Sequence, residues 1–382
     1  MKRETRCVHS GSYRDEASGG INTPIFTSSA FEYIDREELP YPRYFNTPNQ
    51  LAVVKKVCAL EGAEDGVLFS SGMAAMSTTI LAFAGAGDHV VMQDELYGGT
   101  HALATDEFDR IGITYSFVAT DAEAVRAAIT DKTKVVVIES PTNPLLGVID
   151  IRKAAEYARS RGATIIIDNT FATPINQNPI GLGVDIVMHS GTKYLGGHSD
   201  ICCGIAVTSR ENAGRIRALA CHLGGSLDAQ TCYLLERSMK TLAVRVERQT
   251  QNAGRVAEFL ALAKAVRSVY YPGLPDARGH EIAASQMSGF GGMLSFDVDE
   301  SRVDPNAFLE RLRLIRPAVS LGGVETTICA PAVTSHAKIS AAERRRIGIS
   351  DSLLRLSLGI EHADDLLADL DQALHARQGG HA

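Results

Sequence analysis

No stretch of the sequence is apolar for the roughly eighteen residues that a transmembrane helix needs, which excludes a membrane span. The N-terminal segment MKRETRCVHSGSYRDEASGG also lacks the apolar core of a signal peptide. None of the seven cysteines falls in a Cys-x-x-Cys pair, and Cys202 and Cys203 resemble small buried apolar residues within an apolar run. Together these absences indicate a reducing, cytoplasmic setting.

The sequence has no basic tail, and its net charge of −7 is spread along the chain. Because nucleic acids and anionic membranes attract basic surfaces, this charge argues against either as the main partner. The hydrophobic fraction of 45% is ordinary for a globular protein, and 382 residues are more than one hydrophobic core usually serves. We therefore expect two domains.

Short β-branched runs alternate with amphipathic segments in the middle of the chain. The strand-like runs lie at 88–93, 114–118, 134–139, 163–168 and 186–189, and helical spacing occupies 51–62, 122–129 and 151–161. The continuously apolar runs VVVIE and TIIID are typical of strands buried on both faces of a parallel sheet. Residues 51–245 are therefore predicted to form an α/β layered domain.

The two ends of the chain differ from this pattern. Residues 1–50 are rich in Gly, Pro, Ser and Tyr without a sustained helical period, so we expect an extended arm that docks on another surface. A long helical pattern at 245–265 then leads into the strand-like runs VRSVYYP, GMLSFDV and LLRLSLG. Residues 246–382 are predicted to form a smaller α+β domain.

The segment HSGTKYLGGHSD, residues 189–200, places a lysine directly after a buried-type strand. Ligand sites in open α/β sheets lie at the carboxyl ends of strands. A lone lysine in a loop is usually a solvated surface charge. Here, however, Ser190 and Thr192 stand beside Lys193, where they could hold a phosphate while the amine bonds an aldehyde carbon. The pattern favours a cofactor site around Lys193.

Two further motifs suit such a site. Asp168 ends the run TIIID, and a buried acid needs a partner, which is either a structural cap or ion pair or the ring nitrogen of a cofactor. Ser71, Gly72 and Met73 stand between a strand and an Ala-rich helix, whose first backbone N–H groups could bind a phosphate. A simple glycine turn is the alternative interpretation.

Together these motifs resemble the Cys/Met-metabolism family of pyridoxal-phosphate enzymes over nearly the whole chain. Besides VDIVMHSGTKYLGGHSD, the motifs ESPTNP, DNTFATP, YYPGLP, SLGG and LRLSLGIE match the family in order. The resemblance implies the type I aminotransferase fold, a three-layer α/β architecture with a mostly parallel sheet and a smaller C-terminal α+β domain. It also implies pyridoxal 5'-phosphate as cofactor and a small amino-acid substrate. We expect no metal ligands.

The resemblance assigns roles to individual residues. Lys193 is implied to hold the cofactor as a Schiff base and to move a proton, Asp168 to pair with the pyridine nitrogen, and Tyr97 to stack on the ring and act as acid or base. The other implied contacts are phosphate ligands Ser71, Gly72, Met73, Ser190 and Thr192, cofactor-pocket residues Glu139, Asn143 and Thr170, and substrate-carboxylate ligands Asn143, Ser320 and Arg355. Tyr41 and Arg43 are implied to reach the phosphate of a neighbouring subunit, so we expect a homo-oligomer, typically a tetramer of dimers with shared sites.

Departures from the family pattern bear on the substrate. Val319 precedes SLGG where many cystathionine-handling members carry Glu, and His101 and Ala102 follow YGGT where animal-like cystathionine γ-lyases have Asn-Arg. Both replacements resemble methionine γ-lyases, which favour a smaller apolar thioether, whereas Gly99 stands where those enzymes usually have Cys. His101 is either an added acid or base or a hydrogen-bonded structural residue.

The implied reaction is γ-elimination from methionine, homocysteine or cystathionine, which gives a thiol, 2-oxobutyrate and ammonia. Two alternatives stay open. One is a γ-replacement transferase of the cystathionine γ-synthase or O-acetylhomoserine sulfhydrylase type, and the other is a cystathionine β-lyase. A non-catalytic protein with this fold is a third interpretation, which the intact set of Lys193, Asp168 and Tyr97 disfavours.

Overall fold

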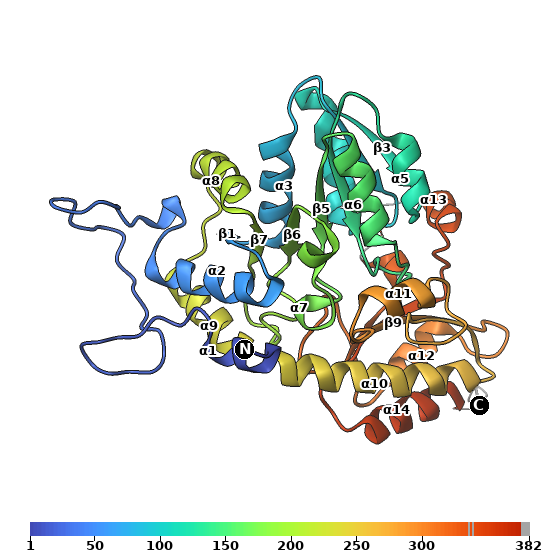
Figure 1. Cartoon of the computed structure of the whole chain (residues 1–382). Coiled ribbons are helices and arrows are strands. Elements are labelled where there is room, and N and C mark those ends of the chain that lie inside the picture. The colour runs from blue at the N-terminus through green and yellow to red at the C-terminus, as the bar shows by residue number, and fades with distance from the viewer. Residues whose placement is uncertain (335–336, 338–339, 376–382) are drawn as a thin grey trace.

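The computed structural model describes residues 1–334, 337 and 340–375, and its larger part is a sheet between two layers of helices (Figure 1). The strands of this sheet are β1 (Asp65–Phe69), β2 (His89–Gln93), β3 (Thr114–Val118), β4 (Thr133–Glu139), β5 (Thr164–Asp168), β6 (Ile186–His189) and β7 (Gly204–Thr208). Their order across the sheet is β1-β7-β6-β5-β4-β2-β3. All neighbours from β3 to β6 run parallel, whereas β7 is antiparallel to both β6 and β1. The mostly parallel α/β sheet is confirmed.

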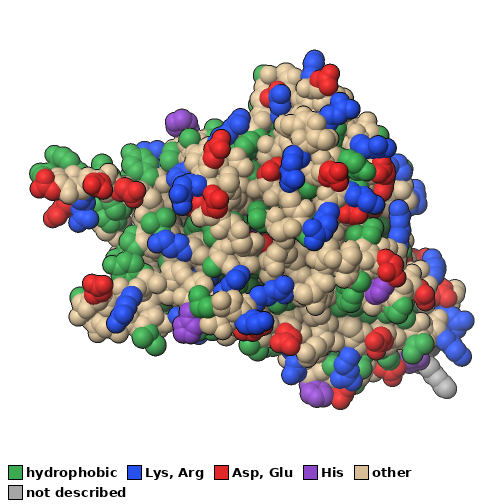
Figure 2. Space-filling model, viewed as in Figure 1, with side chains coloured by type: hydrophobic (Ala, Val, Ile, Leu, Met, Phe, Trp, Pro, Cys, Tyr) green, Lys and Arg blue, Asp and Glu red, His purple; other side chains and the backbone are tan. Residues whose placement is uncertain are grey.

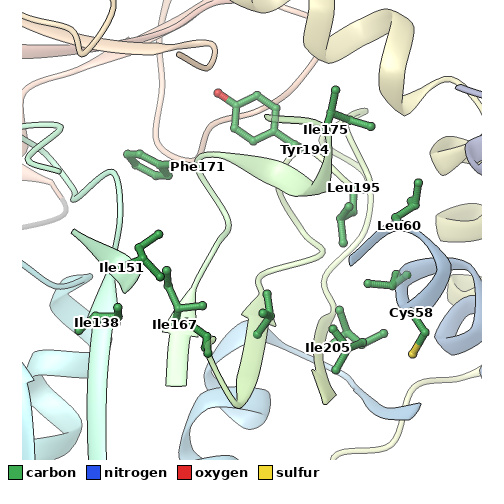
Figure 3. Close-up of a cluster of buried hydrophobic side chains, with 14 of the residues drawn as sticks. Cys58, Leu60, Ile138, Ile151, Ile167, Phe171, Ile175, Tyr194, Leu195 and Ile205 are labelled. Atoms are coloured by element: carbon green, nitrogen blue, oxygen red, sulfur yellow. The ribbon is translucent and has the colours of Figure 1, made fainter. Parts of the chain in front are cut away.

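Alternating side chains of β4 show how the layers arise. Val136 and Ile138 join the core on one face, under α2 (Pro48–Glu61), α5 (Ala122–Ala128) and α6 (Ile151–Ser160). Val135 and Val137 join the core on the other face, under α3 (Gly72–Phe83) and α8 (Arg210–Leu223). Because both faces are covered, these side chains are fully buried and the strand reads as one apolar run. Figure 3 shows part of the first core, including Ile138, Ile151 and Ile167.

The predicted strands of the larger sheet end at the residues where the sequence places them, whereas several other elements were not predicted. Among these are β7, α8 and α9 (Ala229–Met239), which packs against α2. Helix α2 begins at Pro48, three residues before the predicted start. The Thr47 side chain and the Gln50 side chain form a capping box there, and Gly62 ends the helix with φ 77°.

A second sheet forms the C-terminal part, with the order β10-β11-β12-β9-β8. Its strands are β8 (Val266–Tyr270), β9 (Met293–Val298), β10 (Arg316–Pro317), β11 (Thr327–Cys329) and β12 (Leu353–Ser357). The helices not yet named are α4 (Gly98–Leu103), α7 (Thr173–Asn176), α10 (Leu242–Leu262), α11 (His280–Gln286), α12 (Pro305–Arg311), α13 (Ala341–Arg346) and α14 (Ala363–His375). The long helix α10 crosses the predicted boundary at 245, so the domain limits themselves stay a prediction.

The N-terminal residues differ in part from the predicted extended arm. Residues Arg3–His9 form α1, which packs against α2 and α10 and buries Cys7. This correction has a simple cause, because a helix of seven residues is too short to show a hydrophobic period. Residues 10–41 contain neither helix nor strand and leave the body as loops (Figure 1). Among the described residues, no helix is both long and apolar enough to cross a bilayer.

Candidate active site

Several strand ends meet at one edge of the larger sheet. Strands β4, β5 and β6 run parallel and end there at Glu139, Asp168 and His189. Because β7 is antiparallel to both β6 and β1, strand β1 ends at the same edge, and the chain turns there into α3. The topology therefore brings the three motifs predicted to bind a cofactor to one place.

A pocket of about 480 Å³ opens at this edge, between the larger sheet and residues of the C-terminal part. The predicted site residues that line it are Ser71, Gly72, Met73, Tyr97, Glu139, Asn143, Asp168, Thr170, Ser190, Thr192, Lys193, Ser320 and Arg355. Residues from opposite ends of the sequence thus share one cavity.

Lys193 projects its amine toward the C-terminal part of the pocket. Its Nζ donates a hydrogen bond of 2.8 Å to Ser320 Oγ. Burial lowers the pKa of Lys193, and the nearby Arg355 charge lowers it further. A lysine with a lowered pKa holds its proton less tightly, so the amine is prepared to act as nucleophile or base.

Asp168, the last residue of β5, lines the same pocket. The backbone N–H of Thr170 donates 3.0 Å to Asp168 Oδ1, and the Thr170 hydroxyl bonds the same oxygen. Burial raises the pKa of Asp168, while these hydrogen bonds and the charge of His189 oppose the rise. In the described part of the chain no Lys or Arg forms an ion pair with Asp168, so its carboxylate can accept a cationic partner from a ligand.

Glu139 sits beside Asp168 in the register of β4 and β5. Burial, and then the charge of Asp168, raises the pKa of Glu139 well above its ordinary value. Its Oε2 accepts a hydrogen bond of 2.9 Å from the backbone N–H of Tyr97. This contact holds the loop that carries the half-exposed Tyr97 ring.

The start of α3 and the loop after β6 form the opposite wall. Ser71 caps α3 by accepting a hydrogen bond of 3.0 Å from Ala74 N–H, which leaves the first-turn N–H groups of Gly72 and Met73 without intrahelical partners. A Cβ on Gly72 would lie 2.9 Å from Ser190 Oγ, so only glycine lets the two segments come this close. This arrangement suits an anion.

The Thr192 hydroxyl is less able to donate a hydrogen bond to that anion than the sequence suggests. Its hydroxyl donates 3.1 Å to the carbonyl of Cys203 and accepts 3.0 Å from the Cys203 N–H. The hydroxyl proton is therefore already used in tying the Lys193 loop to the start of β7.

Arg355 is a buried cation on β12, only 4% exposed. Its Nη1 donates 2.7 Å to Asn143 Oδ1, and its Nη2 donates 3.3 Å to the carbonyl of Ser320. No carboxylate of the described residues pairs with it. A buried guanidinium with only neutral partners is a site for a ligand carboxylate.

Tyr41 and Arg43 lie outside this pocket. Arg43 donates 2.8 Å to the carbonyl of Cys221 on α8, and its guanidinium lies 5.6 Å from the centroid of the Tyr41 ring. Within one chain, these two residues therefore do not reach the other predicted site residues.

The pocket also contains residues that were not predicted: Thr100, Phe171, Met188, Cys202, Leu321, Cys329, Val333 and Thr334. Cys202 corrects the sequence interpretation, because it is exposed in the pocket while Cys203 alone is buried. Alternation along an extended segment sends neighbouring side chains to opposite faces, and that signal could have separated the two cysteines.

The structure shows the environments of the three positions that bear on substrate specificity. His101 is outside the pocket and stacks on Phe117, with ring centroids 4.3 Å apart. Val319 lines the pocket and is 70% exposed. A Cβ on Gly99 would lie 2.6 Å from Cε1 of Tyr97, so a side chain here displaces the Tyr97 ring.

The sequence of this chain matches a family model described as Cys/Met metabolism PLP-dependent enzyme over residues 4–375. The chain belongs to this family. Cystathionine γ-lyase of Bacillus subtilis is 44% identical over 379 residues, covering 98% of this chain and 99% of that protein. Cystathionine β-lyase of Lactococcus lactis subsp. cremoris is 43% identical over 380 residues, again covering 98% and 99%.

The fold comparison agrees with the sequence. The crystal structure of cystathionine γ-lyase from Lactobacillus plantarum complexed with L-serine superposes with a TM-score of 0.94 and 42% identity, covering 98% of each chain. The predicted fold class is thereby confirmed, and so is pyridoxal phosphate as the cofactor of this Cys/Met-metabolism enzyme. The site suits that cofactor, since no Lys or Arg of the described residues pairs with the buried Asp168, and the start of α3, where N–H groups can bind an anion, lines the same pocket.

Proposed function

We propose that the protein is a carbon–sulfur lyase that eliminates the γ-substituent of a sulfur amino acid to give a thiol, 2-oxobutyrate and ammonia. One observation carries the proposal. The Lys193 amine and the buried Arg355 guanidinium share a pocket and a loop, because Ser320 bonds the first through its hydroxyl and the second through its carbonyl. An amine that can act as a base thus lies beside a guanidinium that can bind the carboxylate of an amino acid.

Bound pyridoxal phosphate supplies an aldehyde for the substrate amine and a ring that accepts the electron pair released at Cα. The residues of the protein hold the cofactor and the substrate in place. Asp168 holds the protonated ring nitrogen, and the N–H groups at the start of α3, together with Ser190, hold the phosphate. Arg355 and Asn143 bind the substrate carboxylate, which fixes the direction of the Cα–H bond.

Lys193 takes the Cα proton at its Nζ and returns protons along the substrate, since its lowered pKa favours the free amine. Lys193 would pass this first proton to the former aldehyde carbon, and its freed amine would then accept the Cβ proton as the γ-thiolate departs. The Tyr97 hydroxyl gives the departing sulfur its proton. The side chains of Phe171, Leu321 and Met188 add apolar surface to the pocket in which these steps take place.

The distal end of the pocket favours a short apolar substituent. Val319 and Val333 line it, and neither can pair with the second amino and carboxyl groups of cystathionine. Of the described residues, the charged ones that line the pocket are Glu139, Asp168, Lys193 and Arg355, all engaged near the reacting centre. We therefore place methionine and homocysteine ahead of cystathionine as substrates.

A cystathionine β-lyase is the second candidate, because the β-lyase of Lactococcus lactis is as similar to this chain, within one per cent identity, as the γ-lyase of Bacillus subtilis. Both reactions use the same Cα proton transfer. They differ in which sulfur bond lies within reach of the proton donor.

A substrate panel tests the proposal. Purified holoenzyme is given methionine, homocysteine, cystathionine or O-acetylhomoserine, each with and without an added thiol, and the 2-oxo acids are separated. The proposal predicts 2-oxobutyrate from at least methionine or homocysteine without added thiol. Pyruvate from cystathionine alone would establish the β-lyase, and products that form only with O-acetylhomoserine and a thiol would establish a γ-replacement transferase.

The N-terminal arm supports a homo-oligomer with shared sites, and we propose a tetramer built from dimers. Its loops expose large apolar side chains, namely Ile21, Tyr33, Ile34 and Leu39. Figure 2 shows green side chains on the projecting arm at the left, together with acidic and basic ones, and charges of both signs over the body. Arg43 and Tyr41, which miss the pocket of their own chain, would then reach the phosphate of a neighbour.

Subunit mixing tests this arrangement. Arg43→Ala and Lys193→Ala are each expected to be nearly inactive alone, because one lacks the phosphate contact and the other lacks the amine. Mixed subunits can form one intact site per dimer and should regain up to about a quarter of wild-type activity if sites are shared. No recovery on mixing, despite subunit exchange, would show that each chain completes its own site.

The compartment is also a proposal. All seven cysteines are free thiols, which fits a reducing compartment such as the cytoplasm.

A further inference from the structure

A buried acid–base pair lies behind the proposed cofactor carboxylate. Glu61 ends α2 and His189 ends β6, and Nε2 of His189 lies 2.6 Å from Oε1 of Glu61. The His189 side chain is 2% exposed and the Glu61 side chain 0%. Neither residue lines the pocket, and no step of the reaction above uses them.

The hydrogen-bond partners of Glu61 indicate which group can balance the charge of its carboxylate. Oε1 also accepts 2.9 Å from the Asn169 amide, and Oε2 accepts a long 3.4 Å bond from the Asn178 amide. Within the described chain no Lys or Arg forms an ion pair with Glu61. A buried carboxylate without a cation is costly, so His189 is the group that can neutralise it, by carrying a second ring proton. The short contact is typical of a charge-assisted hydrogen bond.

The same pair touches both segments that hold the cofactor residues. Asn169, which bonds Glu61, follows Asp168 directly, and its own N–H donates 2.9 Å to the carbonyl of Met188. His189 directly precedes Ser190. The pair therefore fastens the ends of β5 and β6 to α2 in one buried hydrogen-bond network.

Three other titratable groups surround the pair. Asp168 and Glu139 lie at the neighbouring strand ends, and Cys58 lies one turn earlier on α2, where burial raises the pKa of its thiol to about 12. Burial raises the pKa of Asp168, the hydrogen bonds from Thr170 lower it, and the His189 charge lowers it in addition. A cation at His189 thus favours the ionised form of Asp168.

We propose that Glu61 and His189 are positioning residues that keep an imidazolium behind Asp168, and that this charge keeps Asp168 anionic and the ring nitrogen of bound pyridoxal phosphate protonated. The inference rests on the proposed role of Asp168. It goes beyond that role, because it assigns the electronic state of the ring to two residues that touch neither cofactor nor substrate.

The ring nitrogen itself can be observed. Apoprotein is loaded with pyridoxal phosphate labelled with ¹⁵N in the ring, and the ¹⁵N chemical shift of the full-length holoenzyme is followed from pH 6 to 10. The dissociation constant of the cofactor is measured on the same preparations. Neither readout depends on turnover.

The variants are chosen to change charge with little change in volume. His189→Gln and Glu61→Gln are expected to lower the apparent pKa of the ring nitrogen by about one unit and to weaken cofactor binding about tenfold. Glu61→Asp keeps the carboxylate and should restore the wild-type signal in large part. Glu236→Gln is the matched control, because Glu236 is also a buried glutamate, 3% exposed, but it belongs to α9, accepts a hydrogen bond from Ser12 and does not line the active-site pocket.

Asp168→Asn separates the possible failures. If Asp168→Asn loses the protonated signal while His189→Gln and Glu61→Gln keep it, the inference is wrong and the role of Asp168 stands. If Asp168→Asn keeps the signal as well, the role of Asp168 is wrong. Should Glu61→Gln not accumulate as folded protein, His189→Gln against Glu61→Asp gives the same comparison.

Discussion

Lys193 and Arg355 share one pocket, and the charge of Arg355 acts on the Lys193 amine. Burial is the larger cause of the lowered pKa of Lys193, and the Arg355 charge is the second. Ser320 joins them with a left-handed backbone, φ 78°, which is an uncommon conformation for a residue with a side chain. Such local strain is typical of functional sites.

Removing the Arg355 charge should change the pH dependence of cofactor binding. Without this cation the ammonium form of Lys193 is favoured, so its pKa rises and the free amine appears only at higher pH. Cofactor binding to Arg355→Met apoprotein should therefore begin at a pH about one unit higher than in the wild type. The visible absorption band of the bound cofactor, measured as a function of pH, follows this change. Arg161→Met, at the exposed end of α6, is the control and should leave this pH unchanged.

Gly99 controls the place of Tyr97. A Cβ at this position would lie 2.6 Å from Tyr97 Cε1 and 3.1 Å from Met73 Sδ. Gly99→Ala should displace the Tyr97 ring and lower kcat by roughly a hundredfold, the lower end of what a general acid contributes. Gly181→Ala, which meets nothing within 4 Å, is the control, and equal kcat values for the two variants would remove Tyr97 from the mechanism.

The sequence could place the residues of this site because motifs carry them in order. It could not show the Glu61–His189 pair, since nothing in either segment indicates that the end of α2 meets the end of β6. Alternation could separate Cys202 from Cys203 only if the segment before β7 was first predicted to be extended, which it was not. Contacts between distant segments decide these features.

At the scale of elements, the antiparallel strand β7 determines the geometry of the site. It lies between β6 and β1, so that β1 ends at the same edge as the parallel strands and α3 begins beside the Lys193 loop. The run ICCGIAVTS was not predicted as a strand, whereas the parallel strands were, because alternation with helices marks only the parallel ones. The short α1 escaped prediction for a different reason, because seven residues are too few to show a hydrophobic period.

The first residue of β7 can test this arrangement. A Cβ on Gly204 would lie 2.2 Å from the carbonyl oxygen of Ser71 and 2.7 Å from Gly72 Cα. Gly204→Ala should push the start of α3 away from β7, lower the free energy of unfolding by about 2 kcal/mol and weaken cofactor binding. Gly214→Ala in the middle of α8 has free space and should stabilise the protein slightly, as measured by thermal unfolding of both variants.

At the scale of the whole molecule, both sheets contribute residues to the proposed site. The larger sheet carries the residues proposed for the cofactor, and the smaller one carries Arg355 for the substrate, with Lys193 bonded across to Ser320. The pocket therefore exists only when the N-terminal and C-terminal halves are packed together. The proposed contact of Tyr41 and Arg43 with the phosphate of a neighbouring chain would add a third contribution to the site.

The central claim is that the Lys193 amine carries the cofactor. Borohydride reduction of the holoenzyme followed by mass analysis of its peptides tests it most directly, because reduction fixes the cofactor on the nitrogen that holds it. The account predicts a phosphopyridoxyl group on Lys193 alone. A label on another lysine, or none on the peptide that contains Lys193, would contradict it.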